Sequence, residues 1–274
     1  MKTFLMTGAL AGDVSGSWYE WHNIKEKPQE LIVDHDRFTD DSVLTYAVAE
    51  GLLSGLEGVR RPLTAEDEEG CGAVRAAVTR SLRKYAGLYP DAGYGGSFRR
   101  WAASGSDQPY GSWGNGSAMR ASYAGWLAGS LGEAELFGRL SAEVTHNDPQ
   151  GILGARVVAG SIYLLRNGAD KQAVRRYASL FYRLDFTLDQ IRPAYGFDVS
   201  CAGSVPQAVE AFLEGVDFAD VIRLAISIGG DSDTIAAIAG SLAEAFEPVP
   251  EELRERALAK LDGRLRETVG AVSR

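Results

Sequence analysis

The chain of 274 residues contains only two cysteines, Cys71 and Cys201. Two isolated cysteines form neither a disulfide framework nor a CxxC motif, so a disulfide-stapled scaffold is excluded. No apolar run approaches the roughly 18 residues that cross a bilayer, and we expect no membrane span. Basic residues are also few, with 28 Lys and Arg against 37 Asp and Glu. The net charge of −9 argues against broad binding to nucleic acid, which depends on Lys and Arg contacts to phosphate.

The N-terminus raises one question about targeting. Lys2 precedes an apolar stretch at 4–11 that resembles a short secretory signal. Thr7 and Gly8 interrupt this stretch, and Asp13 follows it directly, which a cleaved signal does not favour. Together with the low cysteine content, this pattern predicts a cytoplasmic protein.

Helical spacing is the dominant pattern of the chain. Apolar residues recur every three or four positions in the segments 44–52, 152–165 and 235–246. Ala-rich amphipathic stretches predict further helices at 65–86, 119–129, 133–144, 170–184, 204–214 and, as one charged surface helix, 250–272. The segment 221–228 is compatible with a buried strand, but its neighbours are helical and we favour a helix. The sequence therefore predicts an all-α protein with a single domain over residues 1–274.

Glycine is unusually frequent, with 32 residues, or about 12% against an average near 7%. Gly8, Gly12 and Gly16 recur at four-residue spacing, which leaves a bare stripe on one helical face and permits close packing of another helix. The longest stretch without helical period, about 87–117, mixes glycines with aromatic residues. A flexible linker would have few aromatics, so we expect an ordered loop with a functional role.

Two acidic strings stand directly before helical segments, namely Thr39-Asp40-Asp41-Ser42 and Asp231-Ser232-Asp233-Thr234. Asp, Ser and Thr are preferred helix caps, so capping alone would explain one such string. Two strings hold more carboxylates than caps require, and neighbouring carboxylates repel one another unless a cation neutralises them. Four carboxylates with hydroxyl oxygens form the hard donor set that Mg²⁺, Mn²⁺ or Ca²⁺ prefers, whereas zinc favours Cys and His. A cation site requires that the two strings meet in space.

The second string also suggests an alternative. Haloacid-dehalogenase-like phosphatases place a nucleophilic Asp at a strand end in the pattern D-x-D-x-T/V. Here Thr234 directly follows Asp233, so the spacing fails by one residue. The chain also lacks the strand–helix alternation of a parallel sheet, and the phosphatase stays a minor alternative.

Three further features carry chemistry. Glu20 lies among Trp18, Tyr19 and Trp21, and desolvation there would raise its pKa as an acid–base catalyst needs, although a surface position explains it equally well. The glycine-rich segment 111–116 precedes a helix, where backbone N–H groups can approach a phosphate or diphosphate, or it forms only a turn. His146 is one of three histidines, and a lone histidine is more often structural than catalytic.

Taken in order, these features resemble the ADP-ribosylglycohydrolase family, typified by dinitrogenase-reductase-activating glycohydrolase. The resemblance spans about residues 8–246. It rests on the ordered set Gly12-Asp13…Glu20, Thr39-Asp40-Asp41-Ser42, Gly114-Asn115-Gly116…Met119-Arg120, Thr145-His146 and Gly230-Asp231-Ser232-Asp233-Thr234. It implies a compact all-α domain of orthogonally packed helices, with two Mg²⁺ or Mn²⁺ ions at the bottom of an ADP-ribose cleft.

The resemblance also implies roles for individual residues. The metal ligands would be Thr39, Asp40, Asp41, Asp231, Asp233 and Thr234. The diphosphate would be held, through backbone N–H groups and the serine, by Gly111, Ser112, Trp113, Gly114, Asn115 and Gly116. His146 would contact the ADP-ribose near its phosphates or adenosine ribose. The catalytic candidates are Glu20, Asp40 and Asp41, and the candidates for stacking on adenine are Trp113, Tyr94 and Phe98.

The implied activity is hydrolysis of the ribose C1″ glycosidic bond in ADP-ribosylated substrates, through an oxocarbenium-like transition state. Protein Ser or Arg adducts and O-acetyl-ADP-ribose are the candidate substrates. Glu20 matches the subgroup that includes serine- and O-acetyl-ADP-ribose hydrolases, which favours O-linked substrates. We expect a monomer that meets nucleic acid only as an ADP-ribosylated substrate. A non-catalytic ADP-ribose-binding module of the same fold is the alternative, and the complete set of acids favours the enzyme.

Overall fold

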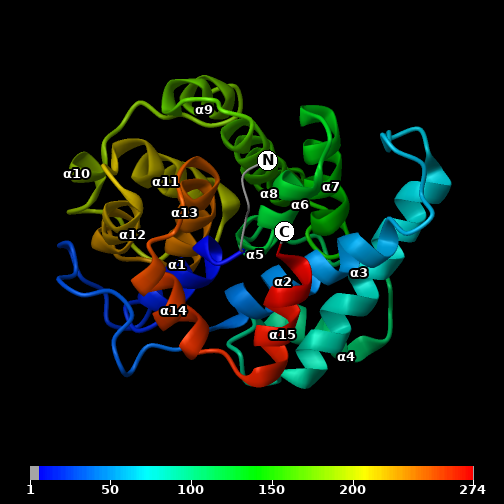
Figure 1. Cartoon of the computed structure of the whole chain (residues 1–274), viewed down its shortest axis with the longest axis horizontal. Coiled ribbons are helices and arrows are strands. Elements are labelled where there is room, and N and C mark those ends of the chain that lie inside the picture. The colour runs from blue at the N-terminus through cyan, green and yellow to red at the C-terminus, as the bar shows by residue number, and fades with distance from the viewer. Residues whose placement is uncertain (1–5, 274) are drawn as a thin grey trace.

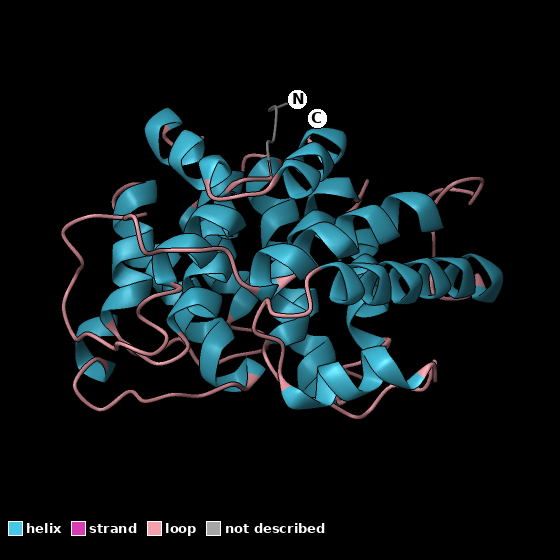
Figure 2. Ribbon diagram, turned by 90° about the horizontal axis from the view of Figure 1, so that it is seen from below, coloured by secondary structure: helices cyan, strands magenta, loops and turns pink. Residues whose placement is uncertain are grey.

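The computed structural model describes residues 6–273, which form fifteen helices and no β-strand (Figure 1, Figure 2). The bounds are α1 (Gly8–Gly16), α2 (Asp40–Gly55), α3 (Glu68–Leu88), α4 (Gly96–Ser104), α5 (Gly116–Met119), α6 (Ser122–Leu127), α7 (Leu131–Glu143), α8 (Pro149–Arg166), α9 (Lys171–Ala178), α10 (Leu188–Ile191), α11 (Cys201–Glu214), α12 (Phe218–Ser227), α13 (Ser232–Phe246), α14 (Glu251–Ala259) and α15 (Gly263–Val272). The all-α prediction is confirmed. The strand that the phosphatase alternative needs is not found in the described part of the chain.

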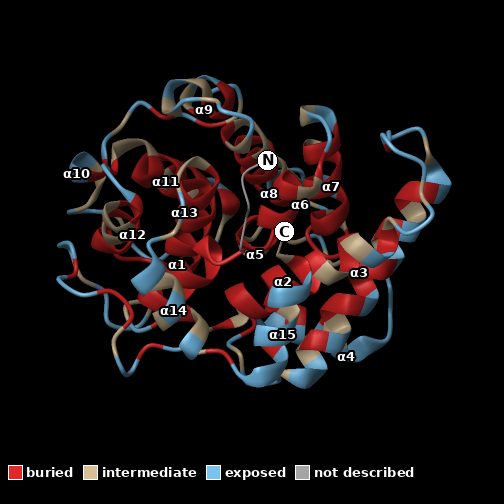
Figure 3. Ribbon diagram, viewed as in Figure 1, coloured by how far each residue is buried: buried red, intermediate tan, exposed pale blue. Residues whose placement is uncertain are grey.

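Helices α1 and α13 form the centre of the fold. Every residue of α1 is buried, as is α13 from Ser232 to Ala245, and Figure 3 shows the buried colour gathered around this pair. The glycine stripe lets the two backbones touch. A Cβ on Gly12 would lie 2.0 Å from the carbonyl oxygen of Ala236, and one on Gly16 would lie 2.5 Å from the Cα of Asp233. The predicted close packing is confirmed, and it carries the C-terminal half of α1 to the start of α13.

The remaining helices surround this pair. In Figure 1, α9 to α12 lie on one side and α3, α4 and α7 on the other, while α2 and α5 contact α13 between them. Exposed residues concentrate on the outer helices α4, α14 and α15 (Figure 3). Within residues 6–273, the helices are too short or too polar to cross a membrane.

The structure bears on four local expectations. The predicted single helix 250–272 is two helices, because Asp262 accepts a hydrogen bond from the Leu265 N–H and so begins α15 as a new helix. The segment 87–117 is not entirely loop, because Phe98 and Trp101 anchor the amphipathic α4 to the core. The ambiguous segment 221–228 is helical, as favoured. Of the signal-like N-terminal stretch, residues 4 and 5 lie outside the described residues, and the part from Gly8 onward belongs to the buried α1.

Candidate active site and metal centre

Each acidic string begins a helix, as its composition predicts. Thr39 is the N-cap of α2, and its side chain accepts a hydrogen bond from the Asp41 N–H at 3.2 Å. Asp231 is the N-cap of α13. The turn before it uses Gly229 and Gly230 with φ of +68° and +79°, a region that side-chain-bearing residues rarely adopt. This turn lets the chain reverse tightly between α12 and α13 and places the second string beside α1.

Asp13 is the site residue to which the sequence analysis assigned no role. Its carboxylate is fully buried and accepts hydrogen bonds from the Thr39 N–H at 2.9 Å, the Thr39 hydroxyl at 2.7 Å and the Ser42 N–H at 3.1 Å. The Ser42 hydroxyl donates to it as well. An acid of α1 therefore caps the N-terminus of α2 from outside that helix. In the sequence, the signal that could have marked Asp13 is that it is the single acid among the small and apolar residues of 8–16.

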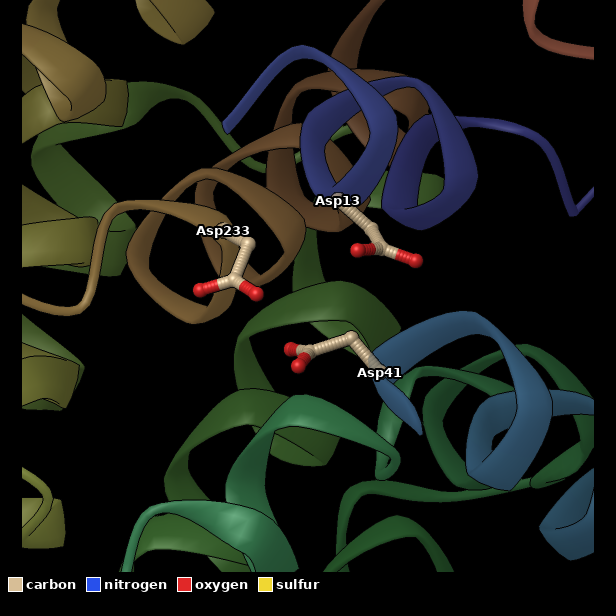
Figure 4. A group of neighbouring side chains, drawn as sticks. All are labelled: Asp13, Asp41 and Asp233. Atoms are coloured by element: carbon tan, nitrogen blue, oxygen red, sulfur yellow. The ribbon is translucent and has the colours of Figure 1, made fainter. Parts of the chain in front are cut away.

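The two acidic strings meet in space. The Thr234 hydroxyl donates to Asp41 Oδ2 at 3.1 Å, joining α13 to α2. Carboxylate oxygens of Asp13, Asp41 and Asp233 lie within 4.8 Å of one another, and Figure 4 shows these three side chains converging from α1, α2 and α13. A second group of three, with the same spacing, comprises Glu20, Asp231 and Asp233. Asp233 thus belongs to both groups.

The electrostatics of this cluster call for a cation. Burial raises the pKa of Asp13, and burial followed by repulsion from neighbouring carboxylates raises the pKa of Asp41 and Asp233 well above the usual value. One buried oxygen, Asp41 Oδ1, has no hydrogen-bond partner within residues 6–273. Such a group is costly to leave unsatisfied. The donors are all oxygen, so the cluster fits a hard divalent cation such as Mg²⁺ or Mn²⁺.

Asp40 and Glu20 border the cluster differently. Burial and then repulsion from Asp13 raise the pKa of Asp40 to about 8, yet its carboxylate belongs to neither group of three described acids. Glu20 is partly exposed, and burial followed by repulsion from Asp231 raises its pKa to about 7. Asn23 fixes the turn that carries Glu20, because its amide donates to the Glu20 carbonyl at 2.8 Å and accepts from the Gly230 N–H.

A cavity of about 500 Å³ opens above the acids, a size that suits a nucleotide-like ligand. Asp41, Asp231 and Asp233 lie in its wall together with Glu20 and Asp40. The glycine-rich segment 111–116 lines it as well, and so do Arg120 and His146. Of the predicted metal ligands, all but Thr39 therefore line the same cavity as the loop and His146, and Thr39 is buried behind them with its hydroxyl donating to Asp13.

Several polar groups of the loop 111–116 are already used within the protein. The Gly111 N–H donates to Asn147 at 2.8 Å, the Gly114 N–H to the Ser112 hydroxyl at 3.1 Å, and the Asn115 N–H to the Val199 carbonyl at 2.7 Å. Of the six backbone N–H groups in this loop, those of Ser112, Trp113 and Gly116 are therefore the ones left to bind a ligand.

The Asn115 side chain points to the acids instead of the loop's open face. It is buried and donates to Asp231 Oδ2 at 2.7 Å and to the Ser204 hydroxyl at 2.9 Å. Asn115 thus ties the glycine-rich loop to the acidic cluster and fixes the distance between the two.

The family model described as ADP-ribosylglycohydrolase matches residues 5–272. The chain belongs to the ADP-ribosylglycohydrolase family. This confirms the resemblance that the ordered motifs carried, and it extends the match beyond them, to the C-terminal helices. The acids and the glycine-rich loop, which carry motifs of the resemblance, both line the cavity.

Known relatives of this glycohydrolase cover nearly its whole length. It is 26% identical to ADP-ribosylhydrolase ARH3 of Homo sapiens, over 91% of this chain and 87% of the relative. It is 27% identical to ADP-ribosylhydrolase ARH3 of Mus musculus, over 91% of this chain and 85% of the relative. A solved structure titled ADP-ribosylglycohydrolase-related protein complex superposes with a TM-score of 0.61 at 23% identity, covering 98% of this chain and 94% of that one, which shows the shared fold.

Exposed aromatic residues line part of the cavity. Of the three candidates for stacking on adenine, Trp113 is 52% exposed and Phe98 is buried, and both line the cavity. Tyr94 is absent from the cavity wall, and its hydroxyl donates to the Tyr85 carbonyl at 3.5 Å. Phe197, which no motif marks, lines the rim and is 51% exposed.

Proposed function

We propose that this protein is a metal-dependent ADP-ribosyl hydrolase that cleaves the ribose C1″ glycosidic bond of ADP-ribosylated substrates and releases ADP-ribose. The observation that carries the proposal is the pair of three-acid groups sharing Asp233, of which all members but Asp13 line a cavity that the loop 111–116 also lines. Membership of the ADP-ribosylglycohydrolase family and the likeness to proteins named ADP-ribosylhydrolase support it.

Two groups of carboxylate oxygens, which have Asp233 in common, support the binding of two Mg²⁺ or Mn²⁺ ions. The residues that would hold them are the carboxylates Asp13, Asp41, Asp231 and Asp233 and the hydroxyls of Thr39 and Thr234. Asp40, which belongs to neither group of three, joins them on the family resemblance and on its place in the cavity wall. When bound, such cations polarise oxygens of the ribose and of the attacking water. Thr39 and Thr234 already donate hydrogen bonds to Asp13 and Asp41, which holds those carboxylates in place before a cation arrives.

Glu20 is the group that donates and accepts protons in the proposed reaction. Its pKa of about 7 lets the carboxyl donate a proton to the leaving oxygen and accept one from water near neutral pH. Its oxygen lies within 4.8 Å of oxygens of Asp231 and Asp233, so it faces the same end of the cavity. The loop 111–116 holds the diphosphate at the other end, and the distance between the ends is fixed by Asn115.

The carboxyl at position 20 also favours O-linked ADP-ribose as substrate, because the family resemblance associates Glu20 with hydrolases of serine-linked and O-acetyl ADP-ribose. A hydrolysis panel tests this directly, with ADP-ribosyl-serine peptide, ADP-ribosyl-arginine peptide, O-acetyl-ADP-ribose and ADP-ribosylated DNA. We expect release of ADP-ribose from the serine adduct or the O-acetyl ester in the presence of Mg²⁺ or Mn²⁺.

Controls separate catalysis from binding. EDTA and the variant D233N, which removes one charge from both groups of acids, should each abolish release. A protein that binds ADP-ribose tightly, hydrolyses none of the four substrates with either metal, and ignores EDTA would instead be the non-catalytic binding module.

A further inference from the structure

His146 presents one ring nitrogen to the glycine-rich loop. A Cβ added to Gly116 would lie 3.1 Å from His146 Nε2, and one added to Gly114 would lie 3.6 Å away. A side chain at either position would cover this nitrogen. Since His146 lines the cavity, the glycines keep Nε2 accessible to a ligand that occupies the loop.

The other nitrogen is held by a neighbour. His146 Nδ1 lies 2.8 Å from the Thr145 hydroxyl oxygen. Arg120 Nη2 donates to that same oxygen at 2.7 Å. Because a guanidinium only donates, the threonine oxygen accepts from Arg120 and keeps its own proton to give away. If His146 Nδ1 carried the proton and donated to the second lone pair of this oxygen, the threonine proton would be left with the Ala142 carbonyl at 3.4 Å, which is too long for a good O–H···O bond. Donation from the threonine hydroxyl to His146 Nδ1 at 2.8 Å instead gives that proton a good acceptor, and this arrangement is favoured.

From this chain of hydrogen bonds we infer that Arg120 and Thr145 are positioning residues that fix His146 as the tautomer with its proton on Nε2. The imidazole is then a neutral hydrogen-bond donor aimed at an anionic group held by the loop 111–116. That this group is a diphosphate rests on the proposed function, whereas the tautomer follows from the contacts alone.

The surroundings keep the ring uncharged. Arg120 is completely buried, and its Nε and Nη1 have no hydrogen-bond partner among the described residues. Burial, followed by the positive charge of Arg120, lowers the pKa of His146 well below its usual value. Tyr110 is the other titratable neighbour, with its ring centroid 5.8 Å from that of His146 and its hydroxyl beside Thr145. Asp40 is the carboxylate that acts on Arg120, whereas the charge that acts on His146 is that of Arg120 itself, so a second proton on the ring is disfavoured.

The tautomer is measured without any ligand. The chain has three histidines, of which His22 and His35 are exposed, so ¹⁵N-detected imidazole spectra hold three sets of signals, and the set lost in H146Q belongs to His146. We expect His146 to show a protonated Nε2 and a bare Nδ1 from pH 5 to 8. T145V should lose this preference and T145S should restore it. A protonated Nδ1 in the wild type, or an unchanged spectrum in folded T145V, overturns the inference.

Affinity for ADP-ribose in Mg²⁺ provides the second measurement. A glutamine amide nitrogen reaches the position of Nε2, whereas that of asparagine reaches the position of Nδ1. H146N should therefore lose about 10-fold or more in affinity, as expected for a hydrogen bond to a charged group, and H146Q should recover most of that loss. Equal losses in H146Q and H146N would contradict a donor at Nε2. A wild type that fails to bind ADP-ribose would refute the proposed function and leave the tautomer result standing.

Discussion

Replacing Asp41 by asparagine should make the metal-free protein more stable while removing its response to metal. Asp41 is buried beside Asp13, Asp40 and Asp231, all of which repel it. Two unit charges about 5 Å apart repel by about 3 kcal/mol at an effective dielectric constant of about 20. Asparagine keeps the shape, and its amide oxygen can still accept from the Thr234 hydroxyl.

The gain is smaller than the full repulsion, because raised pKa values leave part of the cluster protonated. We expect about 1–3 kcal/mol, which raises the melting temperature by about 2–12 °C at about 2–4 °C per kcal/mol. In the wild type, a divalent cation at 100 times its dissociation constant adds about 2.7 kcal/mol, or about 5–10 °C. In D41N most of that increment should disappear.

Differential scanning calorimetry at pH 8 measures both effects, with EDTA in one series and Mg²⁺ or Mn²⁺ in the other. The variant D34N is the matched control, because Asp34 is exposed, belongs to neither group of acids and has its carbonyl bonded to Lys260, so both of its melting temperatures should follow the wild type. The reasoning is refuted if D41N melts lower than the wild type in EDTA and gains as much from metal.

Three further outcomes follow from the structure. In EDTA, the free energy of unfolding should fall as pH rises from about 4 to 8. The reason is that Asp40 has a pKa of about 8 in the folded state against 3.8 in the unfolded state, so the folded state holds an extra proton across this window. Urea unfolding at several pH values measures this free energy, and saturating metal should flatten the trend. G12A should destabilise the protein by about 2–4 kcal/mol or prevent folding, since its Cβ would lie 2.0 Å from the Ala236 carbonyl oxygen; a soluble variant with wild-type unfolding would contradict the close packing of α1 on α13. E20Q should lower single-turnover hydrolysis by about 100-fold or more with nearly unchanged ADP-ribose affinity, and normal turnover would remove Glu20 from proton transfer.

The helices that depend on neighbouring residues could be predicted from the sequence. Helical period found most of the long helices, including α8, which the structure begins at Pro149 with Asp148 as its cap, the Asp148 side chain accepting from the Gln150 N–H at 2.8 Å. The short α4 was missed, because its anchors Phe98 and Trp101 are only two residues within a glycine-rich stretch and gain their meaning from the surface they pack against.

Among the site residues too, those with a local pattern could be predicted and those with distant partners could not. Both acidic strings could be recognised as candidates, since each carries its hydroxyls and carboxylates within four residues. Asp13 could not be assigned a role, because its partners Thr39 and Ser42 lie 26 and 29 residues away and are reached only when α1 lies against α2. The same holds for the loop 111–116, where Val199 and Asn147 use N–H groups that the sequence left open for a ligand.

The sequence by itself determined the helical class, the caps and the chemical kind of site, because hydrophobic period, capping and donor type depend on neighbouring residues. The tertiary structure decided that the acids share one cluster around Asp233 and that Asn115 links them to the loop. It also decided which nitrogen of His146 faces the cavity. These are distances between segments far apart in the chain, and they arise only when the bare face of α1 packs against α13.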